Sequence, residues 1–138
     1  GDAQHIAGEL VSKFNFDRPP LAALELNTNS PLLTAISNDY GYNKSFARQI
    51  QANGKAGDVF IAISTSGHSE NIIEAVEEAN NMGIITVGLV GSKMCPLDKT
   101  CQYVIKVPSE YTPNIQETQI MIGHIICGLV EERIFTSR

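Results

Sequence analysis

The chain has 138 residues, and its net charge at pH 7 is −5 with no cluster of basic residues. This charge disfavours nucleic acid as a direct ligand, because nucleic-acid-binding surfaces gather Lys and Arg. No apolar stretch approaches the roughly 20 uninterrupted residues of a membrane-spanning helix, and nothing at the start resembles a signal peptide. The length fits one domain with a hydrophobic core and is short for two.

Charged residues make up 18% of the chain, below the roughly 25% typical of soluble domains. We therefore expect some apolar surface to be covered by other subunits. The three cysteines, Cys95, Cys101 and Cys127, have neither a paired framework nor a C-x-x-C spacing. This pattern is typical of reduced, structural cysteines in a cytoplasmic protein.

Apolar spacing, capping residues and turn residues predict the elements in the first half of the chain. A helix is expected at residues 1–11 and a strand at 22–26. Residues 27–31 form a turn that leads into a short helix, which ends near residue 37. A loop follows at 38–42, and a helix capped by Asn43 then ends near Gly54. Because the first helix begins without a cap, we expect further sequence of the domain upstream of Gly1.

In the second half, β-branched apolar runs alternate with helical patterns. Strands are expected at 59–63, 84–90 and 103–107, and helices at about 70–82, before Gly83, and from about 114 to 134. Strands that alternate with helices favour a parallel sheet covered on both faces. We therefore predict an α/β fold, a Rossmann-like three-layer sandwich with a parallel sheet, as a single domain over residues 1–138.

The last predicted helix is apolar around most of its circumference. Ile115, Ile122 and Leu129 lie seven residues apart. Further apolar residues fill the neighbouring faces: Ile125, Ile126, Val130 and Ile134. A helix with this pattern is buried on more than one side. In a domain of this size we expect the second side to lie in an oligomer interface; a core helix of a monomer is the alternative.

Four hydroxyl residues lie between the strand at 59–63 and the helix that follows it: Ser64, Thr65, Ser66 and Ser69. A helix N-terminus offers unpaired N–H groups and a partial positive charge, which suit a phosphate. One hydroxyl would suffice as an N-cap, so four of them favour phosphate or phosphosugar binding over capping alone. His68, in the same segment, is expected to shape the turn.

Two histidines and a glutamate have a spacing suited to a metal ion. His5 and Glu9 are four residues apart on one face of the first helix, and His124 lies within an apolar run of the last helix. The ordinary alternatives are a surface pair and a satisfied core histidine. Together, with the amide of Gln116 as a fourth ligand, these residues would suit zinc. Gln116 and His124 are eight residues apart, about 12 Å along a straight helix. One of them would therefore come from a neighbouring chain, unless Gln116 precedes the helix.

Several segments together resemble a known family. Residues 63–71 (ISTSGHSEN), preceded by 37–42 (SNDYGY) and followed by 115–117 (IQE), resemble the sugar isomerase (SIS) domain. The similarity covers essentially the whole chain in the same order. Four further residues make the resemblance more specific: His5, Glu9, Gln116 and His124. With them, the chain resembles most closely the isomerases that act on bacterial heptose phosphates. The family normally has one more strand and a loop upstream of the position of Gly1.

The resemblance implies an enzyme that interconverts sedoheptulose 7-phosphate and glycero-manno-heptose 7-phosphate in the cytoplasm, at the start of heptose synthesis for the lipopolysaccharide core. It also implies a homotetramer with active sites at subunit interfaces and one zinc ion per subunit. The family's zinc ligands fall on His5, Glu9, Gln116 and His124, and its proton-transfer pair falls on Glu9 and His124. Its sugar-binding positions fall on Asn38, Asp39 and Gln116, and its phosphate-binding positions on Ser64, Thr65, Ser66 and Ser69.

The chemistry of such an isomerase fits these residue types. Moving a carbonyl between C1 and C2 needs a base for a carbon-bound proton and an acid for the carbonyl oxygen. Zinc near both oxygens would favour the enediol. A carboxylate bound to zinc is a weaker base, so either Glu9 leaves the metal when substrate binds or the metal is mainly structural.

Two other classes of protein are alternatives. A non-catalytic SIS module would bind a phosphosugar or associate with a replication initiator, but the presence of both Glu9 and His124 favours the enzyme. A nucleotide-binding Rossmann domain ranks third, because no G-x-G-x-x-G follows any predicted strand. Pro113 and Gln119 depart from the residues expected at these positions in the family.

Overall fold

Three parallel strands form the centre of the fold in the computed structural model, which describes residues 1–136. They are β1 (Val59–Ile63), β2 (Ile85–Val90) and β3 (Tyr103–Lys106), in the spatial order β1-β2-β3. Val59 pairs with Ile85, and Val87 pairs with Tyr103. The β-branched and aromatic residues of these segments suit a pleated sheet. The predicted parallel sheet and α/β class are confirmed.

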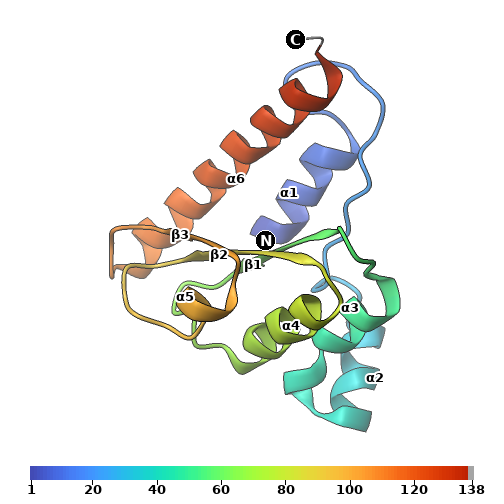
Figure 1. Cartoon of the computed structure of the whole chain (residues 1–138), viewed down its shortest axis with the longest axis vertical. Helices are drawn as coiled ribbons and strands as arrows, with labels where there is room; N and C mark the ends of the chain where they lie inside the picture. The colour runs from blue at the N-terminus through green and yellow to red at the C-terminus, as the bar shows by residue number, and fades with distance from the viewer. Residues whose placement is uncertain (137–138) are drawn as a thin grey trace.

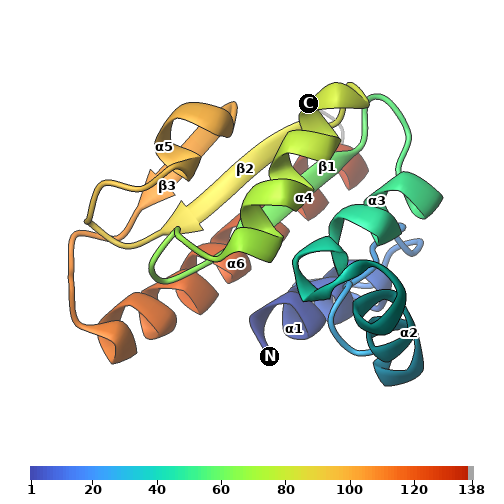
Figure 2. The ribbon, with the colours of Figure 1, turned by 90° about the horizontal axis from the view of Figure 1, so that it is seen from below.

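Helices cover both faces of the sheet, as Figures 1 and 2 show. On one face lie α1 (Asp2–Val11) and the long α6 (Thr112–Phe135). On the other face lie α4 (Glu70–Asn81) and the short α5 (Leu97–Thr100), and α3 (Ala47–Asn53) lies beside α4. Farther from the sheet are α2 (Ser30–Tyr40) and the 3-10 turn η1 (Tyr42–Lys44). The predicted three-layer arrangement is therefore confirmed.

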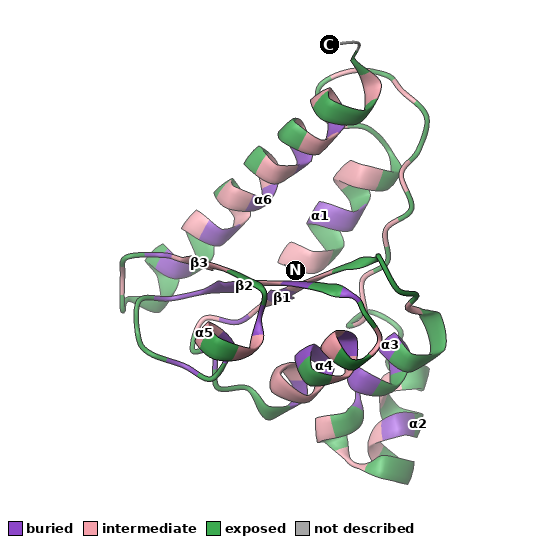
Figure 3. Ribbon diagram, in the orientation of Figure 1, coloured by how far each residue is buried: buried purple, intermediate pink, exposed green. Residues whose placement is uncertain are grey.

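The hydrophobic core lies between the sheet and the helices α4 and α5, where buried residues gather (Figure 3). Its fully packed members are Ala62, Val76, Val90, Cys95, Leu97 and Cys101. The three cysteines are free thiols and buried, as the sequence predicts. Burial raises the pKa of the Cys101 thiol to about 11, so this thiol stays protonated at neutral pH and acts as a small apolar residue.

Most helix boundaries agree with the sequence prediction to within a few residues. The cap residue Met82 follows α4, and the backbone at Gly83 has a φ of +75°, which favours glycine just after a helix. On α2, the side chain of Asn29 accepts a hydrogen bond from the amide of Leu32 and so caps the helix.

Three local predictions are wrong. Residues 22–26 form no strand: the amide of Leu21 donates to Leu10 and the Gln49 side chain donates to Leu26, so this segment is bound to helices instead of to β1. Residues 38–40, expected in a loop, are the last turn of α2, because Gly41 is the first residue whose φ, +98°, breaks the helix. Asn43 caps no helix; its amide donates to Glu74 on α4.

Helix α6 has one buried face and a second face that is apolar and exposed. Its buried stripe is Ile115, Gln119, Gly123, Cys127 and Glu131. On another face, Met121, Ile125 and Leu129 are 53%, 53% and 56% exposed. Among residues 1–136, none of the helices has the length and apolar character that crossing a bilayer would require.

Candidate active site on the face of α1 and α6

The helices α1 and α6 lie side by side and bring two histidines and a glutamate together (Figure 1). His5 and Glu9 are one turn apart on α1, and His124 lies near the middle of α6. Their ligand atoms all lie within 4.8 Å of one another, and the two histidine Nε2 atoms are 3.0 Å apart. The fold thus brings together three of the four predicted metal ligands.

Small residues on α6 allow this close approach of the two helices. A Cβ at Gly123 would lie 2.7 Å from Cδ1 of Ile6 on α1, closer than two carbon atoms can pack. One turn later, the Cys127 Sγ lies 4.0 Å from the carbonyl oxygen of Ile6. A larger residue at position 123 would displace the Ile6 side chain and disturb the packing of α1 against α6.

Aromatic contacts orient the imidazole of His124. The Phe14 ring stacks on it with a centroid distance of 5.6 Å and an interplanar angle of 29°. The His5 ring lies 5.0 Å away at an angle of 57°. Because rings on two sides limit its rotation, the His124 Nε2 atom faces His5.

The three residues fit a zinc ion. Two imidazoles with one carboxylate form a familiar zinc donor set, and two nitrogens bound to one tetrahedral zinc lie roughly 3.3 Å apart. The two Nε2 atoms here are 3.0 Å apart. The lone pairs of two nitrogens at this distance repel each other unless a proton or a cation lies between them. His5 is exposed, which leaves one side of the cluster open to a further ligand.

Gln116 lies away from this cluster in its own chain. It belongs to α6, so the alternative in which it precedes the helix is wrong. Its position, eight residues before His124 in that helix, corresponds to about 12 Å of helix rise. It lines a broad, open cavity of about 1600 Å³ together with Ser64, Thr65 and Ser69.

The segment from Ser64 to Ser69, here called the hydroxyl loop, connects the carboxyl end of β1 to the start of α4. Ser64 Oγ accepts a hydrogen bond from the Gly67 amide, and Ser66 Oγ accepts one from the His68 amide. Gly67 has a φ of +70°, and a Cβ there would lie 2.3 Å from the Cys95 Sγ. The sharp turn of the loop therefore requires a glycine.

Capping does not use the remaining hydroxyls of the hydroxyl loop. Ser69 occupies the N-cap position of α4, but its side chain makes no capping hydrogen bond. The hydroxyls of Thr65 and Ser69 have no hydrogen-bond partner among residues 1–136. Both residues line the open cavity. Two free hydroxyls beside the unpaired amides of a helix N-terminus can receive an anion.

Asn38 and Asp39 do not join these groups within one chain. Both are exposed at the end of α2, in the helical layer on the other side of the sheet (Figure 2). The Asn38 side chain donates to Asp39 Oδ1 at 3.4 Å. Ser66 is exposed, and unlike the other hydroxyl residues of its loop it is not part of the cavity wall.

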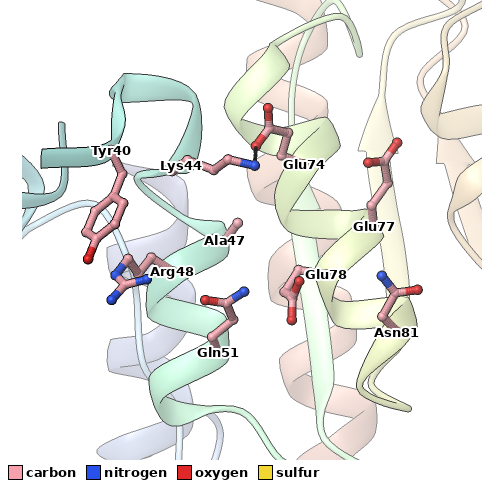
Figure 4. A pocket seen from close by; sticks show the side chains of 9 residues that line it. All are labelled: Tyr40, Lys44, Ala47, Arg48, Gln51, Glu74, Glu77, Glu78 and Asn81. Atoms are coloured by element: carbon pink, nitrogen blue, oxygen red, sulfur yellow. Dashed lines mark ion pairs between the residues drawn. The ribbon is translucent and has the colours of Figure 1, made fainter.

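A smaller cavity of about 410 Å³ lies between α3 and α4 (Figure 4). Within it, Lys44 and Glu74 form an ion pair of 2.7 Å, and the Arg48 guanidinium lies 4.0 Å from the centroid of the Tyr40 ring. None of the predicted site residues lines it. We therefore assign the chemistry to the α1 and α6 face.

Sequence reasoning missed the residues that support the site. Phe14 and Glu131 were not singled out, although a glutamate within the apolar pattern of the last helix was a usable signal. Gln119, noted only as a departure, is fully buried and donates its amide to the Leu89 carbonyl at 3.0 Å. It fixes α6 to β2.

Comparison with known proteins agrees with this geometry. A family model described as the SIS domain matches residues 1–91. The phosphoheptose isomerase of Aneurinibacillus thermoaerophilus is 60% identical over 137 residues, which are 99% of this chain and 69% of that protein. Phosphoheptose isomerase 2 of Campylobacter jejuni is 58% identical over 134 residues, 97% of this chain and 67% of that protein.

Solved structures give the same result. A phosphoheptose isomerase from Francisella tularensis superposes with a TM-score of 0.90 at 34% identity, covering 96% of this chain and 73% of that one. The enzyme from Neisseria gonorrhoeae has a TM-score of 0.87 at 37% identity, with coverages of 95% and 70%. The chain belongs to the SIS domain family. Within it, the chain groups with the phosphoheptose isomerases, which are enzymes.

Proposed function

We propose that the protein interconverts D-sedoheptulose 7-phosphate and D-glycero-D-manno-heptose 7-phosphate through an enediol, with one zinc ion per subunit. The observation that supports this most strongly is the convergence of His5, Glu9 and His124 within 4.8 Å. It occurs in a chain 60% identical to a phosphoheptose isomerase. A binding module would not need two imidazoles and a carboxylate at one point.

Glu9 is the proposed base, and His124 is the proposed acid. Converting the ketose to the aldose requires removal of a proton from C1, protonation of the C2 oxygen, and then the reverse pair of transfers at C2 and the C1 oxygen. Once released from the metal, the carboxylate of Glu9 can take the carbon-bound proton, and the imidazole of His124 can supply one to oxygen from the ring nitrogen that does not bind the metal. A zinc ion held by these residues would supply positive charge near both oxygens of the sugar.

The hydroxyl loop is the proposed phosphate site. The hydroxyls of Ser64, Thr65, Ser66 and Ser69 would donate hydrogen bonds to the phosphate oxygens, next to the amides that begin α4. Ser64 and Ser66 already receive amide hydrogen bonds, but each hydroxyl proton remains available as a donor. The loop would therefore bind a phosphate without a lysine.

A homotetramer would complete the site. The exposed apolar stripe Met121, Ile125 and Leu129 on α6 suits burial against a second copy. His124 meets His5 within one chain, so Gln116 would be the ligand that a neighbouring subunit supplies. Asn38 and Asp39, on the far layer, would likewise reach sugar bound by another subunit. We assign the product to heptose synthesis for the lipopolysaccharide core, in the cytoplasm.

The proposal is tested by replacing the acid–base pair. Glu9→Gln and His124→Ala should each lower kcat by about 10²–10⁴-fold, the usual contribution of such groups. Glu9→Gln should keep the fold and phosphate binding. His5→Ala should lower zinc content first and activity as a consequence. Glu77→Gln, at an exposed glutamate on α4, is the matched control and should keep native activity.

Near-native kcat in both Glu9→Gln and His124→Ala would refute the assignment of these residues. The non-catalytic SIS module would gain support only if the native protein also failed to isomerise the sugar.

A further inference from the structure

Glu131 is a buried carboxylate on α6 that the proposed chemistry does not use. Its side chain is fully buried. Oε2 accepts hydrogen bonds from the Phe14 amide and from Arg18 Nε, and Oε1 accepts one from the Asn15 amide, each at 2.8 Å. Three donors on one carboxylate fix the segment after α1 to α6.

Arg18 extends this network to the end of α1. While its Nε binds Glu131, Nη1 donates to the Leu10 carbonyl at 2.7 Å and Nη2 donates to the Glu9 carbonyl at 2.8 Å. The last carbonyls of a helix have no partner within the helix, and a positive charge there is favourable. Arg18 therefore caps α1 at the residue that supplies the proposed base.

Phe14 extends the network to the other half of the acid–base pair. Its amide is bound to Glu131, and its ring stacks on His124 at 5.6 Å. One buried carboxylate thus determines where the Phe14 ring lies, and the Phe14 ring limits the orientation of the imidazole. Glu9 and His124, which lie on different helices, are both linked to Glu131.

Stability alone explains this arrangement poorly. A buried ion pair loses much of its attraction to the cost of removing two charges from water, and apolar residues of similar size often stabilise a fold as well. What apolar residues cannot do is direct hydrogen bonds to the Glu9 carbonyl and to the Phe14 amide at once. The arrangement suits groups that must hold a fixed geometry.

We propose that Arg18, Glu131 and Phe14 are positioning residues, which hold Glu9 and His124 in the geometry needed for metal binding and proton transfer. This role rests on the proposed function. It predicts that weakening the network changes zinc affinity and kcat, while KM is unchanged because the hydroxyl loop is formed by other elements.

The test compares Arg18→Lys and Phe14→Leu with the native protein. Lysine keeps the charge opposite Glu131 but lacks the nitrogens that reach the Glu9 and Leu10 carbonyls; leucine keeps bulk but removes the stacked ring. Zinc affinity is measured by competition with a chromophoric chelator. Each variant should bind zinc about 10-fold or more weakly, as expected for residues that orient ligands, with lower kcat and native KM.

Lys44→Gln is the control, because it breaks an ion pair on the far layer without touching the network. It should keep native zinc affinity. If Phe14→Leu and a folded Arg18→Lys both keep native zinc affinity and native kcat, the positioning role is refuted, while the proposed function stands. An equal loss of zinc affinity in the control Lys44→Gln would refute the positioning role in the same way. A native protein that binds no zinc would overturn the proposed function as well.

Discussion

Gly123 lies next to His124 in the sequence, and its missing side chain lets α1 approach α6. The Ile6 side chain occupies the space that a Cβ at position 123 would need. The distance between the two helices places the His5 and His124 Nε2 atoms 3.0 Å apart. At the scale of single residues, the close packing of α1 on α6 beside the site therefore depends on the glycine at position 123.

Glu131 gives a residue-scale prediction about acid stability. Burial alone would raise the pKa of its carboxyl, but hydrogen bonds from the Asn15 and Phe14 amides and from Arg18 outweigh burial and hold the pKa below its ordinary value of 4.5. The ionised carboxylate therefore stabilises the fold at pH values above 4.5, and this contribution is lost as the pH falls through the lowered folded-state pKa.

Glu131→Gln should accordingly have a lower Tm than the native protein at pH 7. The gap should narrow as the pH falls below 4.5, because the native protein then loses its advantage. Thermal melts followed by circular dichroism from pH 7 to pH 3 measure this. A gap that stays constant over the whole range would contradict it, and Glu77→Gln should show no such trend.

Single residues differed in how well the sequence predicted them. His5 and Glu9 were predictable because four-residue spacing on a helix is a local property, and His124 was conspicuous as a polar residue in an apolar run. Phe14 was not predictable, because an aromatic residue in a connecting segment has no local signature of its partner. Its contact with His124 depends on how residues 12–20 are held by Glu131.

The hydroxyl loop is the element for which the structure does not support the capping interpretation of the sequence. Ser69 stands at the N-cap position of α4 and makes no capping hydrogen bond. Ser64 and Ser66 stabilise the turn itself through the amides of Gly67 and His68. The hydroxyl groups can therefore stabilise the turn and still bind an anion, and none of the four caps the helix.

Replacing two hydroxyls of this loop tests its role as the phosphate site. Ser66→Ala combined with Ser69→Ala should weaken binding of the sugar phosphate about 100-fold or more, because each of the two lost hydrogen bonds to a charged group costs about 1.5–3 kcal/mol. The fold should be retained, since neither side chain is buried. Isothermal titration and melting curves measure both properties.

Unchanged affinity in the double variant would show that the hydroxyls serve only the turn. Thr34→Ala, at an exposed hydroxyl on α2, is the control and should bind as the native protein does.

Elements with strong local patterns were predicted well, and those that depend on tertiary contacts were not. The runs that became β1 and β2 are β-branched, and α6 has an apolar period over many turns. Residues 22–26 (AALEL) are mostly apolar but contain no β-branched residue, and this segment is bound to α1 and α3 instead of to a strand. The four-residue α5 is too short for its sequence period to be recognised.

At the scale of the whole molecule, α6 has a buried face and an apolar exposed face. The buried face packs on α1 and contacts β2. Met121, Ile125 and Leu129 on the exposed face are each more than half exposed. Four-residue spacing places them in one stripe, and an apolar stripe on a surface helix is typical of an interface.

Ile125→Asp combined with Leu129→Asp should therefore dissociate the proposed tetramer. Carboxylates buried in an interface would be unpaired, which opposes association. Sedimentation velocity at micromolar concentration should show smaller species, with loss of zinc and activity because Gln116 of a second copy would be absent. Thr112→Asp adds charge at an exposed position of α6 off the stripe and should leave the assembly intact. A native protein that sediments as a monomer would refute the interface.

The most direct test of the account is the fate of sedoheptulose 7-phosphate in D₂O, followed by NMR with the zinc-loaded protein. Proton transfer through an enediol predicts an aldose product that carries solvent deuterium at C2. A chelator should abolish the conversion, and added zinc should restore it. A zinc-loaded protein that binds the sugar and leaves it unchanged, or one that converts it equally well in the chelator, would contradict the account.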